Sequence, residues 1–86
     1  MTVPIQRGSP RAPAARRFAR ELRKAMEARK VGRIRLAMAM GLKSHSIIAQ
    51  WRSGNSLPRL DSATALTEVL EWPRLREIVE DARTQV

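Results

Sequence analysis

The 86-residue sequence contains no cysteine and a single histidine, His45, and these absences remove several classes of site. Without cysteine the chain can form neither a disulfide nor a thiolate metal centre. One histidine cannot build a histidine-based metal cluster. The sequence also offers no paired nucleophile and base and no phosphate-cradling glycine loop. We therefore expect neither an enzyme nor a bound cofactor.

Long apolar runs are also missing. No stretch approaches the length of a membrane span, and no apolar signal-peptide segment follows the first residues. A chain of this length makes one small domain, with a core only just large enough to fold without disulfides or metals. These features predict a soluble intracellular protein that does not contact a membrane.

Acidic residues are scarce in the first two thirds of the chain. Residues 1–35 carry eleven Lys and Arg against two Glu, a net charge of +9, and residues 36–59 carry three cations and no acid. Residues 60–86 carry three Arg against six acids, a net charge of −3. Basic surfaces bind phosphate backbones by releasing condensed counterions, so this asymmetry predicts a polyanionic partner.

The spacing of apolar residues predicts helices over residues 14–29, 33–40, 60–70 and about 73–84. In the first of these, apolar positions recur at steps of three and four around Phe18, which we expect in the core. Residues 1–13 contain three prolines and one glycine and show no helical period, so they predict a flexible basic arm before a domain of residues 14–86.

Residues 41–54 are typical of a turn followed by one short helix. The Ser44 hydroxyl can cap the helix by accepting a first-turn N–H, and Gly54 can end it in the left-handed conformation. Ile48 and Trp51, three residues apart, predict the buried face. With the helix of residues 33–40 before it, this segment would make a helix-turn-helix. Its outer positions carry His45, Ser46, Ile47, Ala49, Gln50 and Arg52.

An ordered series of residues supports this interpretation. It consists of Leu36-Ala37, Gly41-Leu42, Ile48, Trp51, Gly54, Pro58, Leu60, Leu66 and Leu70. This series resembles the DNA-binding domain of the Cro and phage-repressor (lambda repressor-like) helix-turn-helix family, over roughly residues 18–72. The resemblance implies a compact, all-α domain of five helices whose third helix enters the DNA major groove. It also implies a transcription regulator of phage, prophage or bacterial origin, located in the bacterial cytoplasm or nucleoid or in a phage-infected host.

Matching backward from Trp51 and Gly54 places the family's base-reading positions on His45, Ser46 and Gln50. Gln50 can pair with adenine, and Ser46 and His45 can bond to base edges. Ile47 is expected beside them, facing outward, where it could contact a thymine methyl. Near phosphates we expect Arg33, Lys43, Ser44, Arg52, Asn55, Ser56 and Arg59. In the N-terminal arm, Arg7, Arg11, Arg16 and Arg17 could follow phosphates or enter the minor groove, or the arm could be a solvated tail.

Three features depart from the family pattern. Gly41 and Gly54 lie thirteen steps apart, one more than is usual, so the turn should be longer by one residue, with Lys43 inserted. The places of the family's internal Arg–Glu pair hold Met26 and Arg52, which frees Arg52 to face solvent or DNA. Ile34 occupies a position that is normally polar and outward.

The helix predicted at residues 73–84 has an apolar stripe that allows two interpretations. It could form a homodimer contact, as the corresponding region often does in relatives, or it could complete the core of the monomer. The stripe consists of Leu75, Ile78, Val79 and Ala82.

The most direct hypothesis is a repressor or Cro-like protein that binds double-stranded DNA, without a small-molecule ligand. One alternative is an antitoxin that neutralises a partner toxin and represses its own promoter. In that case the last helix or the arm would bind the toxin. A second alternative is a basic protein that binds nucleic acids without base recognition.

Overall fold

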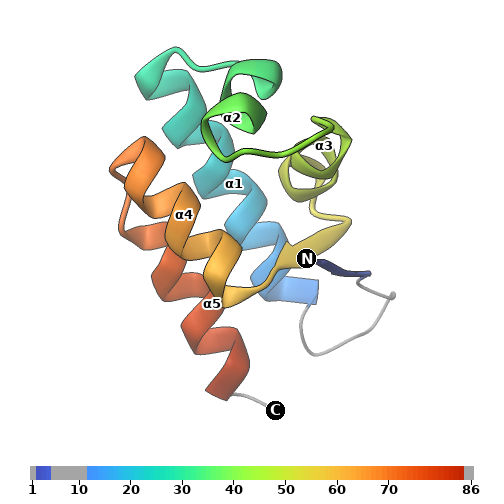
Figure 1. Ribbon diagram of the computed structural model, residues 1–86. Helices are drawn as coiled ribbons and strands as arrows, with labels where there is room; N and C mark the ends of the chain where they lie inside the picture. Colours follow the sequence, from blue (N-terminus) through green and yellow to red (C-terminus); the bar gives the residue numbers. More distant parts are fainter. Residues whose placement is uncertain (1, 5–11, 85–86) are drawn as a thin grey trace.

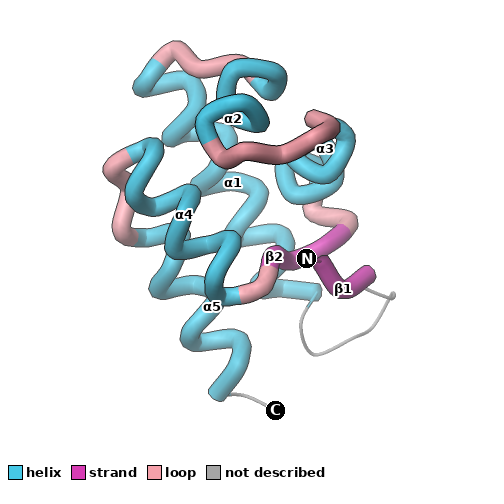
Figure 2. Tube along the Cα trace, in the orientation of Figure 1, coloured by secondary structure: helices cyan, strands magenta, loops and turns pink. Residues whose placement is uncertain are grey.

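The computed structural model describes residues 2–4 and 12–84. These residues form a compact, mostly helical fold (Figures 1 and 2). Each predicted helix is present. No helix in the described part of the chain combines the length and apolar character needed to cross a bilayer. The elements are β1 (Thr2–Pro4), α1 (Ala12–Arg29), α2 (Arg33–Ala39), α3 (Ser46–Ser53), β2 (Ser56–Pro58), α4 (Leu60–Leu70) and α5 (Arg74–Thr84).

The longest helix, α1, lies at the centre of the fold. It packs against α3 on one side and against α4 and α5 on the other (Figure 1). Its apolar residues repeat at steps of three and four, so one face of the helix is buried along its length. Phe18, Leu22 and Ala25 on this face are fully buried, and this confirms Phe18 as a core residue.

Four helices end in the same way, with one residue in the left-handed conformation. These residues are Lys30, Gly41, Gly54 and Glu71, with φ values of 55°, 73°, 81° and 52°. The next N–H donates to the carbonyl five residues earlier, from Val31 to Met26, Leu42 to Ala37, Asn55 to Gln50 and Trp72 to Thr67, at 2.9–3.1 Å. This is the bond of a Schellman motif, which satisfies a carbonyl that the helix leaves unpaired. Val31, Leu42 and Trp72 then pack on the core, so each of these helix ends directs the following segment inward.

Part of the predicted flexible arm forms a strand instead. β1 pairs antiparallel with β2, and Val3 lies opposite Leu57. The three residues of β2 are buried, so their backbone groups need partners within the protein, and β1 pairs with them. α1 also begins at Ala12, with Pro13 in its first turn, where proline is tolerated. Arg7 and Arg11 lie outside the described residues.

The apolar face of α5 completes the core of the monomer. Its four stripe residues are at most 2% exposed, because α5 packs against both α1 and α4. A side chain that is buried within its own chain cannot also cover a partner. The structure therefore supports the core interpretation, and a homodimer built on these four side chains is incompatible with it. The residues are Leu75, Ile78, Val79 and Ala82.

A hydrogen bond between distant residues ties α1 to the segment between α4 and α5. The indole Nε1 of Trp72 donates to Glu21 Oε1 at 3.1 Å. This bond lowers the pKa of the Glu21 carboxyl below its ordinary value of 4.5; burial opposes the shift and nearby Lys24 adds to it. At the C-terminal end of α1, Arg29 Nε donates to the Leu70 carbonyl at 2.9 Å. Polar contacts therefore reinforce the apolar packing of α1.

The Glu21–Trp72 bond predicts an acid-sensitive contribution to stability. A carboxyl whose pKa is depressed in the folded state stabilises the fold above its unfolded pKa, and this contribution is lost as pH falls through the folded pKa. Glu21→Gln should lower the free energy of unfolding at pH 7 by about 0.5–1 kcal/mol, because a neutral acceptor bonds less strongly than a carboxylate. As pH falls below 4.5 and through the lowered folded pKa of Glu21, the variant and the wild type should converge.

Urea unfolding at pH 7 and pH 3 measures both effects. Glu27→Gln, which changes an exposed glutamate on the same helix, is the matched control and should shift stability by less than about 0.5 kcal/mol. An equal difference between Glu21→Gln and wild type at both pH values would contradict the assignment.

Candidate nucleic-acid interface

Two fully buried side chains orient α3. Ile48 and Trp51 are 0% and 1% exposed and belong to the core that α1 helps to build. A helix of eight residues is too short to be stable alone in water, so its anchored face determines which face looks outward. This confirms the buried face predicted from the sequence.

The outward face of α3 carries Ser46, Gln50 and Ser53, all exposed. Their spacing of four and then three residues aligns them along the helix. The Ser53 hydroxyl donates to the Gln50 carbonyl at 3.0 Å. Within the described residues the side-chain amide of Gln50 makes no hydrogen bond, so its donor and acceptor are both available. The sequence analysis missed Ser53, although its spacing from Ser46 and Gln50 indicates the same face.

Two other predicted base-reading side chains are less accessible. Ile47 is half-buried against the core, and it lines a pocket with Leu42 and Trp51. The prediction that Ile47 faces outward is therefore wrong, because its spacing of four residues from Trp51 turns it toward the protein. His45 is half-buried as well, and its Nδ1 is buried without a hydrogen-bond partner among the described residues. Of the four predicted base readers, Ser46 and Gln50 are exposed.

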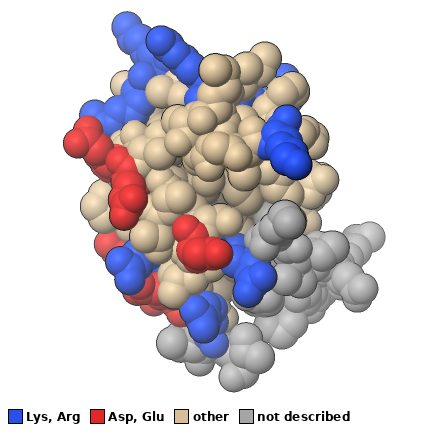
Figure 3. All heavy atoms as spheres, viewed as in Figure 1, with Lys and Arg blue, Asp and Glu red and all other residues tan. Residues whose placement is uncertain are grey.

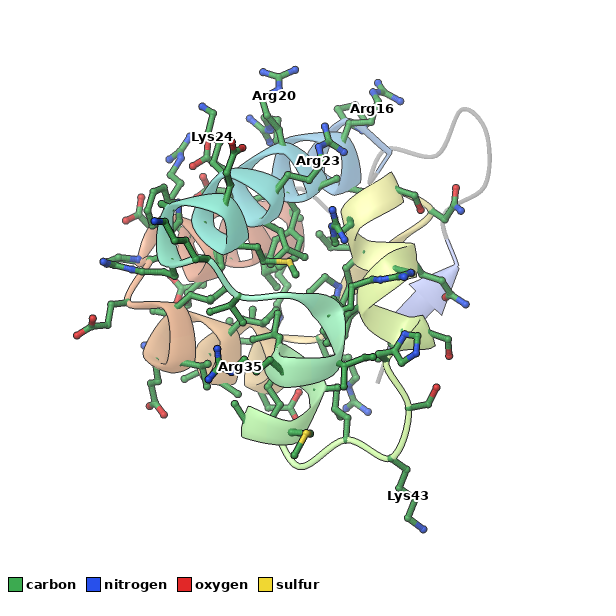
Figure 4. The ribbon with its side chains drawn as sticks, turned by 90° about the horizontal axis from the view of Figure 1, so that it is seen from above. Arg16, Arg20, Arg23, Lys24, Arg35 and Lys43 are labelled. Carbon is green, nitrogen blue, oxygen red and sulfur yellow. The ribbon has the colours of Figure 1, made fainter. Side chains whose placement is uncertain are left out.

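The connection between α2 and α3 spans residues 40–45. In it, the Ser44 hydroxyl accepts the Ser46 N–H at 3.2 Å and lies 2.9 Å from the Ser46 hydroxyl. The Ser44 hydroxyl therefore accepts the N–H of the first helical residue, as predicted, but Ser44 is not the cap: the cap position is His45, whose side chain makes no capping bond. Lys43 is exposed and projects from this connection away from the helices (Figure 4).

Cations of α1 lie beside the C-terminal end of α3. Arg23 Nη1 donates to the Arg52 carbonyl at 2.6 Å, a favourable position for a guanidinium because helix C-termini carry partial negative charge. The Arg16 backbone is close to Gly54, since a Cβ built on Gly54 would lie 3.7 Å from Arg16 Cα. Arg16, Arg20, Arg23 and Lys24 project from the outer side of α1 (Figure 4).

A hollow of about 530 Å³ opens between α1, the connection that follows it and α3, and it is rich in cations. Arg23, Lys30 and Arg52 line it, with Glu27 as its one carboxylate. Arg52 was expected to face solvent or DNA but is half-buried, and its Nε is buried without a partner among the described residues. A phosphate oxygen is a suitable acceptor for such guanidinium and ammonium groups.

The other predicted phosphate contacts divide into exposed and buried residues. Ser56 is 2% exposed and its hydroxyl has no partner in the described part of the chain, so the prediction that it reaches phosphate is wrong. The cause is β2, which packs against α1 and α3 and carries Ser56 inward. The predicted cations and amide that are exposed are Arg16, Arg17, Arg33, Asn55 and Arg59.

Charge is unevenly distributed over the folded surface. In Figure 3, acidic side chains lie on the left and lower parts of the visible face, and the upper part is uncharged or basic. The six acids after residue 59 all belong to α4, α5 and the connection between them. Among the described residues no group of three or more potential ligands could hold a metal ion.

Comparison of the chain with known proteins identifies no similar family, protein or structure. No protein-family model matches the chain, and no curated protein or solved structure matches it significantly.

Gly54, which ends α3, generates a stability prediction. Its φ of +81° strains any residue with a Cβ, although the nearest atom to that Cβ would be at an ordinary contact distance of 3.7 Å. Gly54→Ala should therefore lower the free energy of unfolding by about 1–2 kcal/mol through backbone strain alone.

Gly32→Ala is the matched control for this prediction. Gly32 has a φ of −85°, and no atom lies within 4 Å of a built Cβ. Because Gly32 is the N-cap of α2, where alanine is less favourable than glycine, this substitution should change stability by less than about 1 kcal/mol in either direction. Urea unfolding measures both variants, and similar losses at the two glycines would contradict the strain argument.

Proposed function

We propose that this chain is a sequence-specific regulator of transcription that binds double-stranded DNA, with α2 and α3 as a helix-turn-helix. The two short helices have seven and eight residues and are joined by residues 40–45. Each buries two side chains, Leu36 and Ala37 from α2 and Ile48 and Trp51 from α3. The resemblance of the sequence to the Cro and phage-repressor family supports the same assignment.

The observation that carries this proposal is the division of α3 into two faces. Its inner face is held by the core, and its outer face presents an unpaired amide and two hydroxyl groups from Gln50, Ser46 and Ser53. An α-helix with its side chains fits the width of the major groove. The Gln50 amide can donate to adenine N7 through its N–H and accept from the adenine N6 amino group through its oxygen. The Ser46 hydroxyl, which is hydrogen-bonded to the Ser44 hydroxyl at 2.9 Å, retains a further hydrogen-bonding position for a base edge.

Basic side chains at both ends of α3 provide the electrostatic part of binding. Lys43 precedes the helix, and Arg16 and Arg23 lie beside its C-terminal end. Arg33 is exposed at the start of α2. Contacts from such groups to phosphates set the position of a protein on DNA, and base contacts supply the specificity. Once placed over promoter DNA, the protein would exclude competing proteins, so we favour repression as its mode of action.

The first test is selection of bound duplexes from a random library at about 0.15 M salt, where specific proteins bind their sites at least ~10³-fold better than other DNA. Recovery of a defined site supports the proposal. Absence of enrichment, with affinity that collapses as salt rises, would overturn it in favour of non-specific nucleic-acid binding.

Two substitutions then separate base recognition from phosphate contact. Gln50→Ala should cost about 1–3 kcal/mol on the selected site, relax the preference at one base pair and leave scrambled DNA unaffected. Arg33→Ala should weaken both DNAs alike and reduce the salt slope by about one. Fluorescence anisotropy at several salt concentrations measures both effects.

Arg83→Ala is the control for charge. It removes an exposed cation from α5, which lies at the opposite end of the molecule from α2 (Figure 1). This variant should retain the affinity and salt slope of the wild type. Equal losses on selected and scrambled DNA for Gln50→Ala would remove Gln50 from the base-reading set.

A further inference from the structure

Two large apolar side chains on α2 face solvent. Ile34 and Met38 are 62% and 74% exposed, and their spacing of four residues places them side by side. Neither contributes to the core, and neither could hydrogen-bond to a phosphate or a base edge. Neighbouring apolar side chains gain free energy when a second surface removes them from water.

Cations surround this apolar pair. Ile34 and Met38 line a hollow of about 460 Å³ together with Lys30, Gly32, Arg33 and Arg35, and no carboxylate lines it. The matching surface must therefore carry both an apolar group and a carboxylate. A nucleic acid would satisfy the cations but offers an apolar pair only scattered thymine methyl groups, so a protein surface matches this hollow better.

The chain itself carries a surface of this kind on α4. The third exposed large hydrophobic residue in the described part of the chain is Val69, and it lies next to Glu68. Asp61 precedes Glu68 by seven residues and so lies on the same side of the helix as Glu68. Neither Glu68 nor Arg35 forms an ion pair within the described residues, so both charges are available.

The two surfaces lie clear of the outer face of α3. Figures 1 and 4 place α4 on one side of α2 and α3 on the other. In Figure 4 Arg35 projects from α2 on the side of α4. A contact built on Arg35, Ile34 and Met38 would therefore leave Ser46 and Gln50 exposed.

We propose that α2 and α4 form a self-complementary surface through which two copies of the chain associate. Ile34, Met38 and Arg35 of one copy pack against Val69 and Glu68 of the other. In a two-fold dimer each such contact occurs twice. This inference goes beyond DNA binding, because the contact requires no DNA. Few exposed apolar side chains are available, so the dimer is a weak one, with a dissociation constant on the order of 10⁻⁴ M.

Sedimentation equilibrium of the full chain without DNA tests the proposal, at concentrations from about 10 μM to 1 mM, which bracket that dissociation constant. Arg35→Glu and Glu68→Arg each place like charges opposite one another twice per dimer, so each variant alone should associate at least ~10-fold more weakly. An equimolar mixture of the two variants has one native contact and one reversed contact, both of opposite charge. The mixture should associate like the wild type, as should the double variant R35E/E68R.

Arg83→Glu is the matched control, since it makes the same charge change at an exposed position on α5 and should leave association unchanged. Met38→Ser should weaken association without altering the fold, because Met38 is exposed, and circular dichroism checks this. A wild-type monomer at 1 mM would overturn the proposal. Equal weakening in the single variants and in their mixture would also overturn it. If the wild type is monomeric and Arg35→Glu loses DNA affinity, Arg35 contacts phosphate instead. The selection of bound duplexes tests DNA binding independently of this result.

Discussion

The arrangement of the molecule depends on the burial of Ile48 and Trp51 against the core built around α1. An isolated helix of eight residues would not persist in water, so α3 exists because these two side chains leave the solvent. The same burial turns Ser46 and Gln50 outward and brings the end of the helix to Arg23, whose guanidinium donates to the Arg52 carbonyl. The proposed reading face is thus a consequence of core packing.

The helix ends determine the direction in which the next segment of the chain runs. At each of the first four helix ends a left-handed residue and a bond from the following N–H reverse the direction of the backbone. Glycine occupies two of these positions without strain, but Lys30 and Glu71 hold the same conformation with a Cβ. Val31 and Trp72, which follow them, pack on the core and favour this geometry. Tertiary packing therefore offsets a local cost at both positions.

Much of the fold and part of the candidate site could be predicted from the sequence. Helical periods identified the five helices, and the spacing of Ile48 and Trp51 identified the inner face of α3. The Ser44 hydroxyl accepts the first N–H of α3, and Gly54 ends the helix in the left-handed conformation, both as predicted. Ile47 shows the limit, because its half-burial depends on Leu42, which the α2 end places beside it. Ile34 and Met38 are exposed on α2, but the sequence indicated this exposed apolar face only through Ile34, an apolar residue at a position that is normally polar.

The sequence by itself determined where helices form, which short segments end in turns and which half of the chain is basic. These properties depend on residues only a few positions apart. Tertiary structure alone decided that β1 pairs with β2, that Ser56 is buried and that the stripe of α5 belongs to the core. Each of these outcomes arises between segments far apart in the chain, as when Val3 meets Leu57. Local spacing shows that a face is apolar, but only the packing of distant segments determines what covers it.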